Sequence, residues 1–241
     1  MKTRGDEGDE SAGGNACCDG GAAVLVGRGG WSAMTVRVVP LPPAAWGRAG
    51  QVMTRAFVDD PVFVAMLPGD RDRRSRALQA VMTWIIRLRA VDARVDTTAD
   101  GQAVAVWRPP GYRETPAALL RSAPSLLPVL ASCSPADIRR LVAGMGRWDR
   151  RRAELMPAPH WVLEGVGVDP ARHRSGLGVV LVRHGLARAD ADAVPVLLEA
   201  NSTANRDLWA KLGFTVIDYT DPADEPLGVP VWRMLHQPEP H

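Results

Sequence analysis

Short apolar runs alternate along the chain with longer segments in which every third or fourth residue is apolar. Apolar runs bounded by turn residues predict strands, and the helical spacing predicts helices between them. The dipeptide Asp100-Gly101 is a strong hairpin signal. Strands interleaved with helices indicate a mixed α/β sheet with helices on both faces. Predicted strands span 36–39, 103–107, 161–168, 195–200, 214–219 and 229–235, and predicted helices span about 42–57, 74–88, 115–131, 136–150, 176–190 and 204–212.

The first 33 residues have a different composition, rich in glycine and with acidic residues near the start. Such a segment buries too little apolar surface to offset the entropy lost on ordering. We therefore predict a disordered tail over 1–33 and a single folded domain over 34–241. Met34, where the composition changes, is a second candidate start of translation.

Composition narrows the classes of function. The net charge of +2 is nearly balanced, so nothing indicates nucleic acid or an anionic membrane as a partner. The longest apolar runs fall short of the roughly 20 residues that a membrane span needs. Cys17, Cys18 and Cys133 form neither a disulfide framework nor a spacing typical of zinc. We expect a cytoplasmic protein with reduced thiols and no metal.

One stretch carries most of the chemical information. Residues 166–178 read as a short apolar strand, a basic turn that contains glycine, and the start of an apolar helix. A helix N-terminus offers unpaired backbone N–H groups and partial positive charge. Glycine lets the backbone approach a phosphate, and Arg172 and Arg174 add formal charge. The pattern predicts a site for a phosphorylated cofactor.

Two common phosphate motifs do not fit this stretch. A Walker loop needs lysine followed by serine or threonine, and neither Lys2 nor Lys211 is so placed. A dinucleotide fingerprint begins at Gly165 and Gly167, but Pro170 occupies the third glycine position. We reject both interpretations.

The stretch resembles the acetyl-CoA signature of the GNAT superfamily of N-acetyltransferases. Val168-Asp169-Pro170 and His173-Arg174-Ser175-Gly176-Leu177-Gly178 stand where that family has Val-x-Pro and Gln/Arg-x-x-Gly-x-Gly/Ala. A second block, 198–214, is similar to the family's other cofactor-facing half and ends in Leu-Gly-Phe. Within the family the chain is most similar to the puromycin N-acetyltransferase-like group, through residues 56–61, 103–107 and the spacing of Leu198, Glu199 and Asn205.

The resemblance implies a fold and a cofactor. The fold would be α/β (α+β): a mixed, mostly antiparallel central sheet flanked by helices, with a V-shaped splay between two central parallel strands. Residues 166–168 would diverge from 197–199, and pantetheine amides would pair with the exposed strand. Acetyl-CoA would be the co-substrate. The cofactor-binding residues would be Val166, Gly167, Val168, His173, Arg174, Ser175, Gly176, Leu177, Gly178, Asn205 and Trp209.

The resemblance also implies direct transfer of an acetyl group to an amine, which must lose a proton before it attacks. On an alternating strand, His160, Val162, Glu164, Val166 and Val168 would share one face. Glu164 is our candidate for the catalytic base, with His160 and Glu199 behind it. Asp59 and Asp60 fall in the family's acceptor-side loop and could attract a cationic amine.

Two departures from the family pattern leave a second function open. His173 replaces the usual Gln or Arg, and Trp209 stands where the family often has a tyrosine thought to protonate the CoA thiolate. An indole is no practical acid. We therefore predict an N-acetyltransferase for a small-molecule amine such as an antibiotic or metabolite, with a weakly active acyl-CoA-binding module as the alternative. A peptide acceptor and a homodimer also stay open.

Each interpretation has a plainer structural counterpart. The glycines at 176 and 178 could simply end a turn and begin a helix. Glu164 could be a salt-bridged strand residue, Asn205 a helix cap, and Trp209 a packing residue. The segment from Asp59 to Pro61 could be no more than a helix stop.

Overall fold

The computed structural model describes residues 22–24 and 35–238. In this part of the chain the strands form one sheet in the order β1-β2-β3-β4-β5-β6-β8-β7. All neighbouring strands are antiparallel except β5 and β6, which are parallel. The mixed, mostly antiparallel sheet is as predicted. The strands are β1 (Ala22–Val24), β2 (Thr35–Pro40), β3 (Arg94–Thr98), β4 (Ala103–Arg108), β5 (Trp161–Val168), β6 (Val196–Ala200), β7 (Thr215–Thr220) and β8 (Val231–His236).

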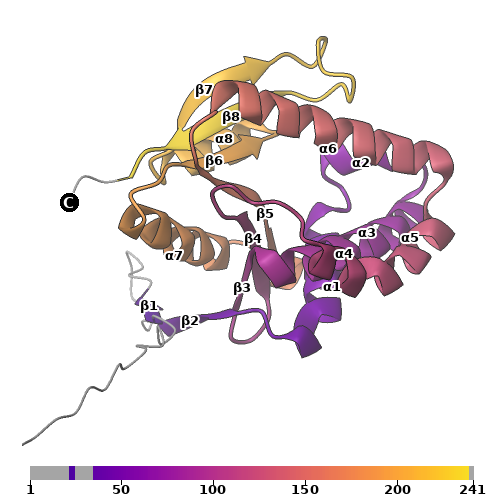
Figure 1. Cartoon of the computed structure of the whole chain (residues 1–241), viewed down its shortest axis with the longest axis horizontal. Helices are drawn as coiled ribbons and strands as arrows, with labels where there is room; N and C mark the ends of the chain where they lie inside the picture. Colours follow the sequence, from indigo (N-terminus) through magenta and orange to yellow (C-terminus); the bar gives the residue numbers. More distant parts are fainter. Residues whose placement is uncertain (1–21, 25–34, 239–241) are drawn as a thin grey trace, which may run out of the picture.

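Helices cover both faces of the sheet (Figure 1). One face carries α1 and α3, and the other carries α7 and α8. The long helix α6 runs from the end of α5 toward the half of the sheet that contains β7 and β8 (Figure 1). The helices are α1 (Trp46–Phe57), α2 (Pro61–Met66), α3 (Arg71–Asp92), α4 (Pro116–Ser122), α5 (Leu126–Ser132), α6 (Pro135–Leu155), α7 (Leu177–Ala191) and α8 (Thr203–Ala210), with single 3-10 turns at Pro43–Ala45, Ala123–Ser125 and Pro170–Arg172.

Each face of the sheet has its own apolar core, because strand side chains alternate between the faces. Val104 and Val106 of β4 pack with α1 and α3. Their neighbours Ala105 and Trp107 pack with α7 on the other face. Trp107 is fully buried beneath Gly185 of α7, where a methyl group would lie 2.0 Å from the indole ring. The helix therefore lies close to the sheet at a position that only glycine permits.

The segment from Asp59 to Pro61 is more than a helix stop. Helix α1 ends at Phe57, but the carboxylate of Asp60 accepts a hydrogen bond of 2.9 Å from the N–H of Val62. Pro61 fills the first position of α2, where a missing N–H is harmless. The same residues that end α1 thus begin a second helix of six residues, which we did not predict.

The predicted N-terminal tail lies mostly outside the described residues. Strand β1 falls within it and pairs with β2. The boundary between a tail at 1–33 and a domain at 34–241 stays a prediction. Among the described helices, none is both long and apolar enough to cross a membrane.

Candidate functional site

The parallel strands β5 and β6 separate partway along their length. They pair from Trp161 opposite Val196 to Leu163 opposite Leu198, and no pairing follows. Strand β5 continues to Val168 along β4, and β6 continues to Ala200 along β8. The predicted V-shaped splay is therefore present, at the carboxyl ends of the two strands. Ligands of open α/β sheets bind where such neighbouring strands diverge.

A β-bulge lies where the strands part. Val106 of β4 pairs with Gly165 and Trp107 pairs with Leu163, so Glu164 is the extra residue on β5. An extra residue reverses the face of every side chain beyond it. Val166 and Val168 accordingly pack on the α7 side, whereas Glu164 contacts α3 on the opposite face. The prediction that Glu164, Val166 and Val168 share one face is wrong, because alternation is interrupted by the bulge.

Beyond the bulge, β5 presents backbone groups to the splay. The N–H of Asp169 donates to the carbonyl of Gln102 at 2.8 Å, on the β4 side. Backbone groups of an antiparallel strand point alternately toward and away from the partner. Val166 and Val168 therefore direct their N–H and C=O groups toward β6, which no longer pairs there. These groups can accept an extended amide chain as an added strand.

The turn after β5 ends in a helix N-terminus without a side-chain cap. Gly176, the N-cap of α7, has φ +80°, and Arg174 has φ +61°, both in the left-handed region. The first described hydrogen bond of the helix runs from Val180 N–H to the Gly176 carbonyl at 3.1 Å. The N–H groups of Leu177 and Gly178 thus have no acceptor among the described residues, which makes this turn a favourable place for an anion.

Neighbouring residues hold the turn in place. The carboxylate of Asp169 accepts a hydrogen bond of 3.1 Å from Ala171 N–H and forms an ion pair of 2.5 Å with Arg55 of α1. The Ala171 N–H, together with Arg55, lowers the pKa of Asp169. The side chains of His173 and Ser175 are exposed, and the Ser175 hydroxyl donates to the Arg172 carbonyl at 2.5 Å.

Gly178 allows α7 to approach the strand. A methyl group on Gly178 would lie 3.3 Å from Val168 Cγ2 and 3.5 Å from Val166 Cγ1. The helix N-terminus is therefore seated on the two residues whose backbone faces the splay. Gly167 faces the other way, where its added methyl would lie 2.6 Å from the sulfur of Met53 on α1.

Helix α8 follows β6 as α7 follows β5. Its N-cap is Ser202, whose hydroxyl accepts a hydrogen bond of 3.2 Å from the N–H of Asn205. The Asn205 side chain is exposed, and Asn205 is not the cap. Trp209 is half-buried against the core on the α7 side. Of the two predicted α8 residues, Trp209 thus packs on the face that carries α7, and Asn205 lies one turn earlier with its side chain exposed.

Glu164 is the centre of a buried ion-pair cluster. Its carboxylate accepts from Arg89 of α3 through both oxygens, at 2.7 and 3.0 Å, and lies 3.0 Å from Arg108 Nε. Arg89 also contacts the Tyr112 hydroxyl at 3.2 Å and Glu114 at 2.9 Å. Burial raises the pKa of Tyr112 despite the neighbouring guanidinium. The cluster places Glu164 beside the splay, on the face opposite α7.

Glu199 has the same position on β6 that Glu164 has on β5. It is the first residue after the paired part of that strand, and Arg152 of α6 donates to its two oxygens at 2.9 and 2.7 Å. Asp149, one turn earlier on α6, accepts from Arg152 and from Arg108, the latter at 2.9 Å. Sequence reasoning missed Arg152 and Asp149, because helical spacing alone does not say which charged residues of a helix face the sheet, and the predicted helix ended at 150, before Arg152.

The remaining acceptor-side candidates lie elsewhere. Asp59 forms an exposed ion pair with Arg71 at 3.1 Å. Asp60 caps α2, and its burial raises its pKa. His160 precedes β5, with its Nδ1 atom 2.8 Å from the Ala158 carbonyl.

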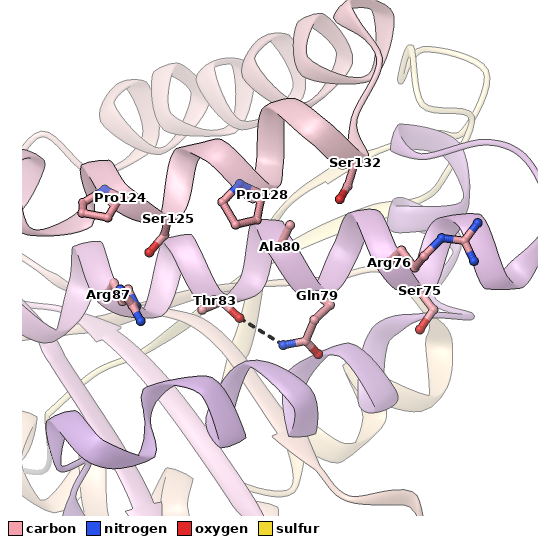
Figure 2. Close-up of a pocket in the computed structure, with 10 residues that line it drawn as sticks. All are labelled: Ser75, Arg76, Gln79, Ala80, Thr83, Arg87, Pro124, Ser125, Pro128 and Ser132. Atoms are coloured by element: carbon pink, nitrogen blue, oxygen red, sulfur yellow. Dashed lines mark hydrogen bonds between the residues drawn. The ribbon is translucent and has the colours of Figure 1, made fainter.

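A cavity of about 580 Å³ is separate from the splay. It lies between α3 and the segment from Pro124 to Ser132, with Arg76 and Arg87 at opposite ends (Figure 2). Gln79 donates to Thr83 across its floor at 3.0 Å. None of the predicted site residues lines this cavity. In the described part of the chain, no group of His, Cys, Asp and Glu is arranged to hold a metal.

Comparisons with known proteins point to one class. Residues 103–214 match the model of the acetyltransferase (GNAT) family. A crystal structure from Corynebacterium glutamicum, described as histone acetyltransferase HPA2 and related acetyltransferase, is 25% identical; it covers 86% of this chain and 99% of its own, with a TM-score of 0.63.

Two further solved structures share the fold at lower identity. Arylalkylamine N-acetyltransferase 2 from Aedes aegypti is 13% identical, covers 85% of this chain and 99% of its own, and has a TM-score of 0.57. The C-terminal condensation domain of Ebony, solved with β-alanyl-dopamine, is 10% identical, covers 84% and 99%, and also has a TM-score of 0.57. Fold and sequence together support the GNAT acetyltransferase family.

Proposed function

We propose that this protein is an acetyl-CoA-dependent N-acetyltransferase that acts in the cytoplasm and acetylates a primary amine of a small molecule by direct transfer. The observation that carries the proposal is the splay after Leu163 and Leu198, which ends beside the uncapped N-terminus of α7. A free strand edge and an anion-binding helix end are the two surfaces that a pantetheine chain with a diphosphate requires.

The residues present fit acetyl-CoA. Backbone groups of Val166 and Val168 face the open edge, and Gly176 supplies a turn without a side chain. In this proposal His173, Arg174, Ser175, Leu177 and Gly178 surround the diphosphate, Gly167 keeps β5 close to α1, and Asn205 and Trp209 contact the cofactor from α8. When bound, acetyl-CoA supplies an activated acetyl group. The strand N–H groups near Val168 would stabilise negative charge on the carbonyl oxygen.

Glu164 is the proposed base. A carboxylate has about four acceptor sites. Arg89 donates to one site on each oxygen of Glu164, and Arg108 Nε lies 3.0 Å from Oε1. One site on Oε2 is left to take the proton from the acceptor nitrogen. Glu164→Gln keeps the size of the side chain and removes this capacity. We expect kcat to fall by about 100-fold with the affinity for CoA unchanged, measured by thiol release and by calorimetry.

Arg89→Met separates the two roles that Glu164 can have. If Glu164 only anchors α3, removing its partner should reduce activity as much as Glu164→Gln does. If Glu164 is the base, Arg89→Met should instead shift the pH profile of kcat, because the charge beside the carboxylate is lost. An unchanged kcat in Glu164→Gln contradicts the base role.

The acceptor is proposed to be a small amine. The arylalkylamine N-acetyltransferase from Aedes aegypti, which shares the fold, supports a small-amine acceptor. The similar structure described as a histone acetyltransferase is the reason to test a peptide acceptor as well. Incubation with acetyl-CoA and a panel of alkylamines, arylalkylamines, puromycin and an N-terminal peptide should release free CoA thiol with an amine. Puromycin tests the resemblance to its own group. The homodimer stays a prediction.

A weakly active acyl-CoA-binding module is the second candidate, favoured by Trp209 at the family's tyrosine position. The two functions give different results in the same assay. Tight binding of CoA without thiol release across the panel, and with no effect of Glu164→Gln, would favour the binding module. Absence of CoA binding would contradict both.

A further inference from the structure

Five charged side chains connect the two diverging strands. Arg108 of β4 contacts Glu164 on β5 at 3.0 Å, and Arg152 of α6 contacts Glu199 on β6 at 2.7 Å. Both arginines also donate to Asp149. Asp149 is thus the middle member of an ionic chain that crosses the open end of the splay.

Asp149 is the most accessible member of this chain. The side chains of the other four are between 6% and 15% exposed, whereas that of Asp149 is 51% exposed. The buried carboxylates of Glu164 and Glu199 each accept two hydrogen bonds from a guanidinium group. An acceptor molecule that approaches the splay from this face would therefore meet Asp149 first.

One oxygen of Asp149 has no hydrogen-bond partner within the described part of the chain. Arg108 and Arg152 both donate to Oδ1. Oδ2 accepts no hydrogen bond from the residues that the structure describes. Burial alone would raise the pKa of Asp149, but the two arginines outweigh burial and lower it, so the group is a carboxylate at neutral pH. A half-exposed carboxylate with a free oxygen attracts a donor that carries positive charge.

The surrounding charge favours the same kind of ligand. Arg89, Arg108 and Arg152 face four carboxylates: Glu114, Glu164, Glu199 and Asp149. The arginines are the buried members, while Glu114 and Asp149 reach solvent. The wall of the splay therefore presents negative charge outward over buried positive charge.

We propose that Asp149 determines specificity for the acceptor, with its free Oδ2 accepting a hydrogen bond from a protonated nitrogen of the incoming amine. The inference rests on the proposed function, which places the acceptor in the splay. It defines the substrate class more narrowly: a cationic amine without a carboxylate beside the nitrogen, because an adjacent negative charge would be repelled.

Tyramine and tyrosine test the proposal, since they share a skeleton and differ by one carboxylate. The wild-type protein should prefer tyramine, by kcat/KM, about tenfold or more. Asp149→Asn keeps the shape and an oxygen for the arginines but loses the charge. We expect its kcat/KM for tyramine to fall about tenfold, mainly through a higher KM. The ratio of kcat/KM for tyramine to kcat/KM for tyrosine should also decrease. The affinity for CoA should stay within about twofold.

Asp218→Asn is the matched control. Asp218 of β7 also joins two arginines, Arg151 of α6 at 2.8 Å and Arg233 of β8 at 2.7 Å. Its side chain is 14% exposed and lies outside the splay. This variant should weaken an ion pair that attaches α6 to the sheet, as Asp149→Asn does. Its kcat and KM with tyramine should stay those of the wild type. An equal rise in KM in both variants would show that Asp149 only supports α6, and would overturn the proposal.

Binding separates this proposal from the proposed function. If the wild-type protein releases no thiol, the acetyltransferase function fails. Calorimetry with tyramine on the CoA-saturated protein then decides the role of Asp149. Weaker binding of tyramine to Asp149→Asn than to the wild type supports it. Equal binding to both, or no binding of tyramine to either, overturns it.

Discussion

At the scale of single residues, the proposed cofactor site depends on backbone angles more than on side chains. Gly176 and Arg174 lie in the left-handed region, and the donors that face the splay belong to the main chain of Val166 and Val168. We expect such a site to tolerate His173 in place of the Gln or Arg usual in the GNAT signature, because the backbone N–H groups are unaffected.

Replacement of Gly176 by valine tests this site. A β-branched residue at φ +80° costs about 1–2 kcal/mol, and it adds a side chain at the N-cap of α7, beside the proposed anion site. We expect the dissociation constant for CoA to rise at least about tenfold, measured by calorimetry on protein whose circular dichroism is unchanged.

Gly228→Val is the control for backbone strain. Gly228 has φ +67° and open space around an added Cβ. This variant should lose similar stability and keep wild-type affinity for CoA. Wild-type affinity in Gly176→Val would contradict the assignment of the turn.

At the scale of elements, the contact of Gly185 with Trp107 holds α7 close to β4. Gly185 lies against Trp107, which is fully buried. Gly185→Ala places a methyl 2.0 Å from the indole, so either the ring or the helix must move. We expect the free energy of unfolding to fall by about 1–3 kcal/mol, measured by denaturant titration. Because a shifted α7 carries its N-terminus with it, the affinity for CoA should fall too.

Gly146→Ala on α6 is the opposite case. An added methyl there meets only the tip of Arg150, at 3.7 Å. Alanine is favoured over glycine inside a helix, so this variant should gain about 0.5–1 kcal/mol. A stabilising effect of both alanine substitutions would contradict the close packing of α7 on Trp107.

The sequence predicted the elements better than their exact contacts. The strand at 161–168 and the helix that follows it were predicted because their apolar patterns are long and regular. The bulge at Glu164 was not predictable, because it depends on how many residues the partner strand places opposite. Helix α2 has six residues, too few to show helical spacing. The arginines around Glu164 and Glu199 come from three distant segments.

At the scale of the whole molecule, ion pairs attach α6 to its surroundings. Asp137 binds Arg73 of α3, Arg151 binds Asp218 of β7, and Arg152 binds Glu199 of β6. Arginine is suited to such contacts because its planar group donates several hydrogen bonds at once. The attachment of α6 should therefore depend on pH.

Acid should weaken the fold through Asp137. Burial would raise the pKa of this carboxyl, but hydrogen bonds from Ser134, Arg73 and Arg140 outweigh it and lower the pKa to about 2. A lowered pKa in the folded state contributes stability above the ordinary value of 3.8, and that stability is lost as the pH falls toward 2. We expect the free energy of unfolding to drop between about pH 5 and pH 2.5.

Asp137→Asn checks the origin of this acid sensitivity. The variant should be about 1–3 kcal/mol less stable at pH 7, since it loses charged hydrogen bonds and weakens the cap of α6. Its stability should also change less between pH 5 and pH 2.5. If the free energy of unfolding of the variant depends on pH as strongly as that of the wild type, other carboxylates cause the acid sensitivity.

The extra residue at Glu164 has a consequence for how this gene can vary. Deleting that one codon would restore regular alternation on β5 and leave its pairing with β4 unchanged, because Leu163 and Gly165 already lie opposite consecutive residues, Trp107 and Val106. Val166 and Val168 would stay on the α7 side. The loss would fall on the buried side chains of Arg89 and Arg108, which would each lose a carboxylate partner. Natural variants that lack this residue should therefore also have replaced those two arginines.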